Sequence, residues 1–348
     1  MRNMMTVCAA LLLALAVETS ARAQTTSSAD GGPYRVDKVI PLGGKGNWDY
    51  LTVDSKRGLL YVPRTTHTMV IDANTGKLVA DIPGQKQNHG VALAPEAGRG
   101  FITDSRAGAV IFDLKTNEVL GSVKTAEGAD GILYDPGSGK VLVACGGADA
   151  LVPIAPDVDP KSGSAGPAVD VGGRPEALAS DGHGKVYITL EDKNQVAVLD
   201  TSAMKVVDKW PTAPGATPVG LAMDREHRRL FIGCRSPQKL IVMSADDGKV
   251  LADFPIGAGC DGTQFDDGYI FASCRDGSLT VIREVTPDKF EPVQTVTTRP
   301  GAKTMGVDPA THTIFLPTAE LGTKRDRRNR PVPKPDSFMI VVVRRSGS

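Results

Sequence analysis

Short apolar runs separated by polar turns recur at a nearly constant spacing along the chain. Each run carries one large apolar anchor, and the anchors are Tyr61, Phe101, Leu142, Tyr187, Phe231, Phe271 and Phe315. Successive anchors lie 40, 41, 45, 44, 40 and 44 residues apart. A repeat of ~40–50 residues made of short strands is typical of a four-stranded propeller blade. The pattern therefore predicts an all-β protein, a seven-bladed β-propeller.

The two ends of the repeat region are incomplete in complementary ways. The last unit ends at the apolar run 339–343, with no fourth strand after it, whereas the run 34–42 (YRVDKVIPL) precedes the first unit without a partner. A ring of blades avoids exposed sheet edges when the first strand completes the last blade. We therefore expect 34–42 to pair with 339–343, so that the propeller covers residues 34–348.

The first residues do not follow the repeat. An apolar stretch, 4–17, is followed by the small-residue motif Ala21-Arg22-Ala23. This order predicts a signal peptide over 1–23, with cleavage near Ala23/Gln24, and a flexible segment over 24–33. We accordingly expect a periplasmic or secreted protein with no membrane span in the mature chain.

The overall charge is balanced, with 40 Lys and Arg against 40 Asp and Glu. Loss of Arg2, Glu18 and Arg22 with the signal peptide would leave a net charge of −1, which gives no general attraction to nucleic acid. A basic, Pro-rich insertion at 323–337 lies between the second and third strands of the last blade. It is interpreted as a solvated loop or, alternatively, as an arm that contacts a polyanion.

Polar residues fall in two columns of the repeat that we expect around one mouth of the channel. The first column begins each inner strand and holds Asp49, His89, Asp130, Glu176, Val219, Asp261 and Lys303, with Trp48 beside it. The second column follows each anchor by three residues and holds Arg64, Asp104, Cys145, Leu190, Cys234, Cys274 and Thr318, with His67, Glu191, Arg235 and Glu320 nearby. His183, His227 and His312 fall in turns at the other end and are expected to be plain surface residues.

These columns predict a ligand site at the channel mouth, although a merely solvated channel would give the same pattern. Mixed carboxylates and imidazoles suit a divalent metal ion or a polar ligand. The predicted ligand residues are Trp48, Asp49, His67, His89, Asp130, Glu176, Glu191, Arg235, Asp261, Lys303 and Glu320. The candidate metal ligands among them are Asp49, His89, Asp130, Glu176 and Asp261.

Four cysteines follow the predicted cleavage site: Cys145, Cys234, Cys260 and Cys274. No pair has C-x-x-C spacing, so neither a zinc knuckle nor a thioredoxin motif is indicated. Export permits disulfides. Because Cys234, Cys260 and Cys274 should lie on mouth loops of blades 5 and 6, we expect two of these three to form a disulfide.

Several segments resemble the bacterial YncE-like proteins of the wider YVTN-repeat propellers, from about residue 39 to the C-terminus. They are WDYLTVD (48–54), HGVALAP (89–95), EDKNQVAVLD (191–200) and FLPTAELG (315–322). The resemblance implies an exported seven-bladed propeller. Through one well-known relative it also implies single-stranded DNA binding as a candidate function. Cys145 and Cys274 stand where such relatives more often carry Asn.

The favoured hypothesis is a non-catalytic binding or scaffold protein of the cell envelope, whose partner is an envelope protein or a small molecule. The sequence has no G-x-S-x-G, H-E-x-x-H or Walker P-loop motif. The first alternative is a metal-assisted lactonase, hydrolase or lyase that acts at the channel mouth. The second alternative is binding of single-stranded DNA or another polyanion.

Overall fold

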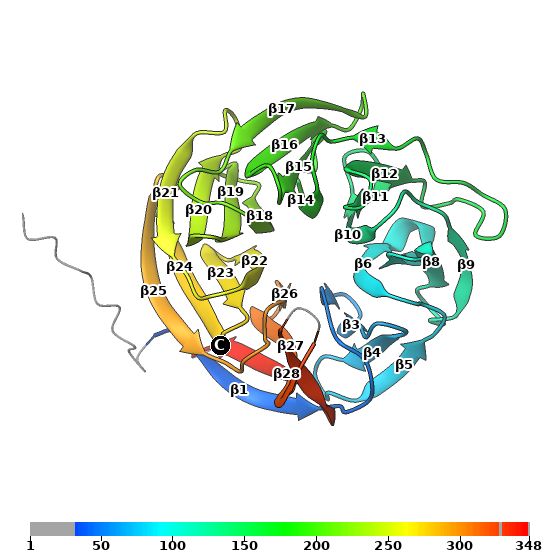
Figure 1. The fold of residues 1–348 in the computed structure, drawn as a ribbon, viewed down its shortest axis with the longest axis horizontal. Coiled ribbons are helices and arrows are strands. Elements are labelled where there is room, and N and C mark those ends of the chain that lie inside the picture. Colours follow the sequence, from blue (N-terminus) through cyan, green and yellow to red (C-terminus); the bar gives the residue numbers. More distant parts are fainter. Residues whose placement is uncertain (1–31, 327–328, 347–348) are drawn as a thin grey trace, which may run out of the picture.

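Seven antiparallel sheets of four strands each surround a central channel, as Figure 1 shows. This computed structural model describes residues 32–326 and 329–346, so the predicted signal peptide lies outside the described residues. The seven-bladed propeller predicted from the repeat is confirmed. Among the described residues, no helix is long and apolar enough to cross a bilayer.

The strands of each blade follow one another from the channel outward. Blade 1 comprises β2 (Thr52–Asp54), β3 (Leu59–Pro63), β4 (Thr68–Asp72) and β5 (Leu78–Ile82); blade 2 comprises β6 (Asn88–Ala94), β7 (Arg99–Asp104), β8 (Gly108–Asp113) and β9 (Val119–Val123), with a 3-10 turn, η1 (Pro95–Ala97), after β6. Blade 3 comprises β10 (Ala129–Asp135), β11 (Lys140–Cys145), β12 (Ala150–Ile154) and β13 (Val169–Asp170); blade 4 comprises β14 (Pro175–Ser180), β15 (Lys185–Leu190), β16 (Gln195–Asp200) and β17 (Lys205–Pro211).

The same order continues around the ring. Blade 5 comprises β18 (Pro218–Asp224), β19 (Arg229–Arg235), β20 (Gln238–Ser244) and β21 (Val250–Pro255); blade 6 comprises β22 (Cys260–Asp266), β23 (Tyr269–Cys274), β24 (Ser278–Thr286) and β25 (Lys289–Thr297). Blade 7 comprises β26 (Gly306–Asp308), β27 (Thr313–Arg325), β28 (Pro331–Arg345) and, on the outside, β1 (Tyr34–Pro41).

The hydrophobic core lies between neighbouring blades. All seven anchor residues of the second strands are buried. Tyr61 of blade 1 packs against Phe112 of blade 2 with ring centroids 5.5 Å apart, and a cluster of buried aliphatic residues surrounds the pair. Both faces of each sheet are therefore covered, which explains why the middle strands read as continuous apolar runs.

Strand β1 closes the ring, as the sequence predicts. It pairs with β28 from Tyr34 opposite Arg345 to Pro41 opposite Met339. The side-chain amide of Gln294 in blade 6 makes two hydrogen bonds to the backbone of Tyr34. It accepts one from the Tyr34 nitrogen over 3.0 Å and donates one to the Tyr34 carbonyl over 2.8 Å. The closing strand is thus attached to its own blade and to the next one.

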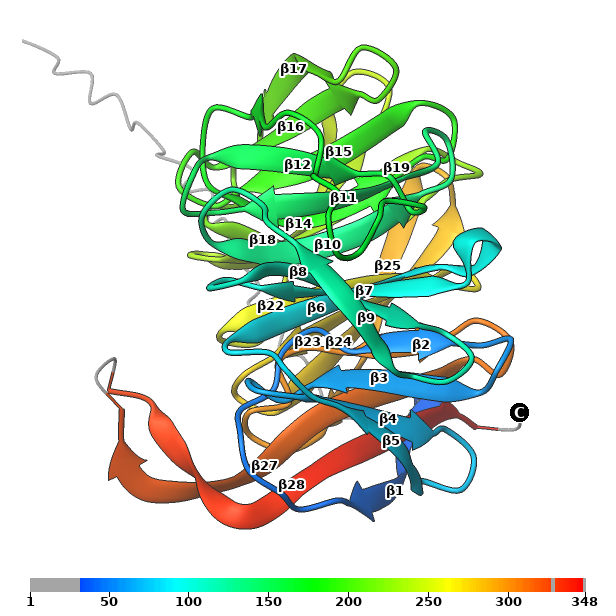
Figure 2. The same ribbon diagram turned by 90° about the vertical axis from the view of Figure 1, so that its right-hand side faces the viewer.

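The basic segment of blade 7 differs from the expected irregular loop. Strands β27 and β28 run past the end of the blade, and Leu321 pairs with Pro333 and Arg325 with Pro331. Figure 2 shows this hairpin of β27 and β28 projecting from one face of the disc. The backbone ladder of blade 7 thus continues into the insertion through two register shifts, one on each side of Leu321.

The expected disulfide is wrong. Cys145, Cys234, Cys260 and Cys274 are all free and fully buried. They lie at strand ends and not on exposed loops, and their thiols face backbone carbonyls, such as that of Gly262 at 3.7 Å from the Cys260 sulfur. The cysteines therefore act as small apolar residues of the core between blades.

Candidate functional site

A β-bulge positions the first-column residues at the channel mouth. In blades 2 to 6 the pairing of the inner strand with the second strand shifts register at this column, as between Asn88 and Val91 around His89. The first-column residue therefore has no partner in the ladder. A bulge leaves its extra residue unpaired and re-aims its side chain, which lets these side chains turn toward the channel axis.

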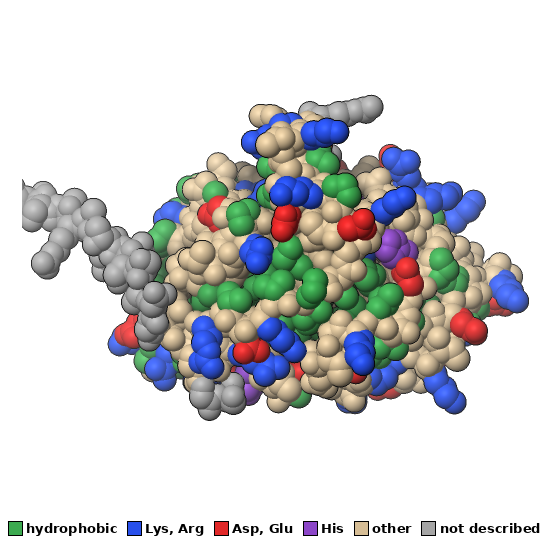
Figure 3. All heavy atoms as spheres, turned by 90° about the horizontal axis from the view of Figure 1, so that it is seen from below, with side chains coloured by type: hydrophobic (Ala, Val, Ile, Leu, Met, Phe, Trp, Pro, Cys, Tyr) green, Lys and Arg blue, Asp and Glu red, His purple; other side chains and the backbone are tan. Residues whose placement is uncertain are grey.

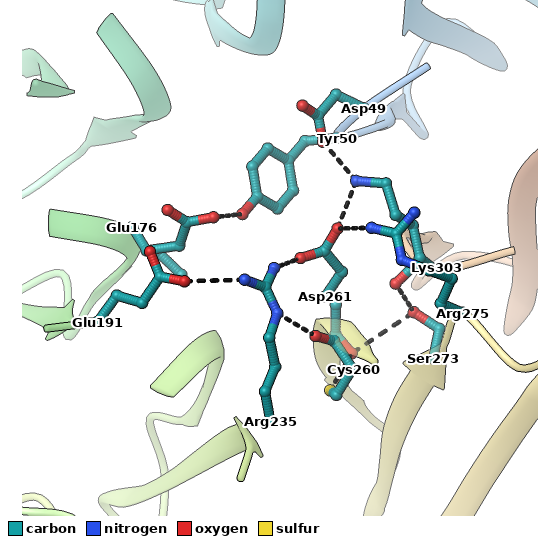
Figure 4. A network of polar contacts seen from close by, with 12 residues as sticks. Asp49, Tyr50, Glu176, Glu191, Arg235, Cys260, Asp261, Ser273, Arg275 and Lys303 are labelled. Atoms are coloured by element: carbon teal, nitrogen blue, oxygen red, sulfur yellow. Dashed lines mark hydrogen bonds and ion pairs between the residues drawn. The ribbon is translucent and has the colours of Figure 1, made fainter. Parts of the chain in front are cut away.

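The first-column side chains meet in one network. The Nδ1 atom of His89 lies 2.8 Å from an Asp49 oxygen and 3.6 Å from an Asp130 oxygen. The Lys303 ammonium lies 3.1 Å from the other Asp49 oxygen and also pairs with Asp261. Blades 1, 2, 3, 6 and 7 thus contribute to one cluster of alternating charge, part of which Figure 4 shows.

Residues just after the second column extend this network. Arg235 pairs with Asp261 and, at 2.8 Å, with Glu191, while its Nε atom donates to the Cys260 carbonyl over 3.1 Å. Arg275 approaches Asp261 at 3.6 Å. These arginines come from the ends of the second strands of blades 5 and 6, so the network reaches around the mouth, as Figure 4 shows.

Tyr50 belongs to the site although the sequence analysis did not single it out. Its hydroxyl donates to Glu176 over 3.3 Å, across the channel mouth. A comparison of blades offers a signal that finds it. The position after the first column is glycine in four blades, namely Gly90, Gly131, Gly220 and Gly262. A Cβ atom at Gly131 would lie 2.2 Å from the Glu176 carbonyl oxygen, so the inner strands approach too closely there for a side chain.

A cavity of about 160 Å³ lies in the channel at this mouth. Tyr50, Glu176 and Asp261 line its polar part. The rest of its wall mixes the polar residues Thr52, Thr263 and Gln264 with apolar ones, namely Leu51, Val91, Ile132, Leu178, Leu221 and Met305. Ligand pockets for drug-sized molecules occupy ~300–1,000 Å³, so this cavity suits only a small ligand or ordered water.

Burial raises the pKa values of the mouth carboxyls, and nearby cations reverse this shift at Asp49. Burial, together with the charges of Asp130 and Asp261, raises the pKa of Glu176 to about 8. Burial and the charge of Asp49 raise the pKa of Asp130 to about 6, against the opposing effect of His89. At Asp49 burial also acts upward, but the Lys303 charge and the His89 hydrogen bond outweigh it and lower the pKa.

The histidine of the ring is held as a cation. Burial acts to lower the pKa of His89, but the hydrogen bond to Asp49 and the charge of Asp130 outweigh burial and raise it to about 9. Asp49, His89 and Asp130 also present ligand atoms within 4.8 Å of one another, which would suit a metal ion. A metal ion at these atoms would have to displace the proton of His89.

Three predicted ligand residues lie outside this network. Trp48 is half-buried; its Nε1 atom donates to the Gly301 carbonyl over 3.2 Å and its ring packs on Phe338, so it joins blades 1 and 7. His67 approaches Asp81 at 3.9 Å at the side of blade 1, and burial lowers its pKa. Glu320 lies on the projecting hairpin. Trp48 is therefore a packing residue and not an exposed stacking platform.

The second column itself does not line the mouth, contrary to expectation. Its seven members are buried. Arg64, for example, donates to the carbonyls of Asn47 and Lys45 and lies over the Phe338 ring at 3.5 Å. Side chains at this position point into the contact between blades, because both faces of every sheet are covered there.

The projecting hairpin carries much of its basic charge in pairs. Lys334 binds Glu320 at 3.0 Å, and Arg330 binds Asp326 at 2.8 Å. Lys324 and Arg325 are exposed on the first strand of the hairpin. Figure 3 shows Lys and Arg side chains gathered on this projection above the wall of the disc.

The sequence matches no known family and no characterised protein. Several solved structures are similar in fold. Hydrazine synthase of Kuenenia stuttgartiensis is 14% identical, with 94% of this chain and 99% of that chain covered and a TM-score of 0.69. The WD40 repeats of RRP9 are 9% identical, with coverage of 88% and 97% and a TM-score of 0.73. U3-55K is 9% identical, with coverage of 87% and 97% and a TM-score of 0.72. At such identities the likeness shows the β-propeller fold alone.

Proposed function

We propose that this chain is an exported, non-catalytic binding propeller of the cell envelope, which takes a small, positively charged ligand at the channel mouth. Export rests on the predicted signal peptide, and membership of the YncE-like propellers rests on the sequence motifs described above. The single observation from which we infer the ligand class is the raised pKa of the Asp130 and Glu176 carboxyls. Burial and the charges of neighbouring carboxylates raise the pKa of both side chains, and the nearby cations only partly offset this rise.

The contacts of the two carboxyls support this choice. The nearest cationic atom to Asp130 among its ion-pair contacts is His89 Nδ1 at 3.6 Å, while the same atom lies 2.8 Å from Asp49. Glu176 accepts one hydrogen bond, from Tyr50. A carboxylate buried without a close cation is unfavourable in its charged form. An ammonium or similar cation would therefore gain two charge-assisted contacts there.

The size of the channel restricts the ligand further. A cavity of about 160 Å³ accommodates a compact molecule at most. Apolar side chains such as Leu178, Leu221 and Met305 share its wall with three polar ones, so a short hydrocarbon portion could enter while the cation stays beside Asp130 and Glu176. A small aliphatic amine combines these properties.

The metal-assisted enzyme remains the second candidate because Asp49, His89 and Asp130 form a group with metal-ligand spacing. Two features make it less favourable. His89 holds its proton up to a pKa of about 9, and the Lys303 ammonium already neutralises Asp49 at 3.1 Å. Polyanion binding by the hairpin is a third proposal, weakened by the ion pairs of Lys334 and Arg330.

A thermal-shift screen of the mature protein tests the proposal, with a series of short mono- and diamines and, separately, divalent ions. A ligand at a hundredfold excess over its Kd stabilises by ~2.7 kcal/mol. We expect an amine to raise Tm and the double variant Asp130→Asn/Glu176→Gln to lose that response. Glu291→Gln, which changes a surface carboxylate paired with Lys289, is the matched control.

The alternatives give different outcomes. An unchanged amine response in the double variant contradicts the proposed site. A response to divalent ions that disappears in His89→Gln favours the metal-assisted candidate instead. Salt-sensitive binding of single-stranded DNA that depends on Lys324 and Arg325 would favour the polyanion proposal.

A further inference from the structure

A second cluster of metal-ligand type lies at the end of the blades opposite the mouth. Asp224 is the last residue of β18, whose first-column residue Val219 is at the other end of the strand. His227 lies in the turn between β18 and β19, and Glu284 comes from β24 of the next blade. His227 was expected to be a plain surface residue, but the fold places it between two carboxylates.

The geometry of the cluster is compact. The Nδ1 atom of His227 lies 2.7 Å from Asp224 Oδ2 and 3.1 Å from Glu284 Oε1. One ligand atom from each residue lies within 4.8 Å of the other two. The side chains of Asp224 and Glu284 are 7% and 3% exposed, whereas that of His227 is 39% exposed. The two carboxylates are thus enclosed and the imidazole closes the site toward solvent.

The carboxylate oxygens in this cluster lack hydrogen-bond partners outside the cluster. Apart from their contacts with His227 and with each other, Asp224 Oδ2 and both carboxylate oxygens of Glu284 are buried with no hydrogen bond from the described residues. The second Asp224 oxygen is satisfied by the Glu226 backbone nitrogen at 2.9 Å. One imidazole proton on Nδ1 cannot satisfy three oxygens at once. Buried carboxylates that are short of positive charge are stabilised by a proton or by a further cation.

A similar histidine pair at the next interface shows what is different here. His312 Nδ1 lies 2.8 Å from Asp266 Oδ2, where Asp266 ends the inner strand of blade 6. Among the described residues, Asp266 has no buried oxygen without a partner. That pair is an ordinary ion pair with one carboxylate, and it provides an internal control for the cluster around Glu284.

We propose that Asp224, His227 and Glu284 bind a divalent ion of the Zn²⁺ class, with water in the remaining position. Two carboxylate oxygens and an imidazole nitrogen are ligands that Zn²⁺ accepts, and the ion would have to displace the proton of His227, as at His89. The ion joins the β18–β19 turn of blade 5 to β24 of blade 6. Arg229 already binds the same region of blade 6, through the Pro287 carbonyl at 2.7 Å and Asp288 at 2.8 Å, so the ion strengthens an existing contact between blades.

The experiment uses the mature protein, stripped with a chelator and dialysed against Zn²⁺. Bound zinc is then counted by elemental analysis, and Tm is measured with and without Zn²⁺. We expect one zinc equivalent and a rise in Tm with Zn²⁺. His227→Gln and Glu284→Gln should each weaken binding by at least ~tenfold, since loss of mere outer-shell partners costs ~10–100-fold. His312→Gln should bind like the parent.

The controls separate this site from the mouth. Asp130→Asn, which alters the mouth cluster, should leave the zinc equivalent in place. No zinc uptake by the parent protein, or undiminished uptake by His227→Gln, overturns the proposal. Loss of the zinc in Asp130→Asn assigns it to the mouth and also overturns it. His227→Gln carries the test if Glu284→Gln fails to fold, because His227 is partly exposed.

Discussion

Substitution of Tyr34 tests whether the ring depends on its closing strand. The side chain is 1% exposed, and its ring packs edge-on against Tyr269 at 5.4 Å and Phe271 at 5.1 Å. Truncating a buried aromatic to alanine costs ~3–5 kcal/mol. At about 2 °C per kcal/mol for a chain of this size, Tyr34→Ala should lower Tm by about 6–10 °C.

The hydroxyl of Tyr34 gives the test a second arm. It is buried with no hydrogen-bond partner among the described residues, and an unsatisfied buried polar group costs ~1–3 kcal/mol. Tyr34→Phe should therefore be as stable as the parent or more stable. Differential scanning calorimetry of both variants measures the two effects in one protein.

Val36→Ala is the matched control, because Val36 lies on the same strand with a side chain 38% exposed. Its effect should stay within ~0.5 kcal/mol. A Tyr34→Ala variant that melts within ~2 °C of the parent would show that β1 contributes little to the ring. A Tyr34→Phe variant as unstable as Tyr34→Ala would show that the hydroxyl has a partner that the fold does not reveal.

Two further predictions concern protons and thiols. Folding raises the pKa of Glu176 from 4.5 to about 8, so between these pH values the folded protein keeps a proton that the unfolded chain has released, and the free energy of unfolding should fall as pH rises. Denaturant titrations at several pH values should show a smaller fall for Glu176→Gln. An unchanged pH slope in this variant would contradict the buried acid. Cys145, Cys234, Cys260 and Cys274 are free, so mature protein unfolded without reductant should titrate four thiols, and a count of two would reveal a disulfide.

The sequence predicted the fold because the determinants of a blade are local and repeated. Anchors such as Phe101 and Phe271 recur with their turns, and register alone indicated that Asp49, His89 and Lys303 would meet. Closure by residues 34–42 followed from counting strands. The contacts confirm this convergence, while ligand binding there stays a prediction.

What the sequence did not reveal depends on contacts between blades. The role of Tyr50 depends on how closely neighbouring inner strands approach, and the cluster at His227 depends on Glu284 of the adjacent blade. The thiols could not be placed because alternation along a strand does not tell which buried face a cysteine occupies. The spacing of hydrophobic residues predicts which positions are buried. The residues that each of them contacts depend on how neighbouring blades pack together.

At the bulges, the inner strands present a side chain to the channel mouth without using that residue for strand pairing. In blades 2 to 6 the residue at the bulge has no ladder partner, while the residues on either side of the bulge stay paired with the second strand. The side chain at this position can differ from blade to blade without a change in strand pairing, as Val219 shows by occupying the same position as Glu176 and Asp261. The bulge thus frees the mouth side chain of a blade from the demands of strand pairing, and propellers with the same disc need not share a ligand.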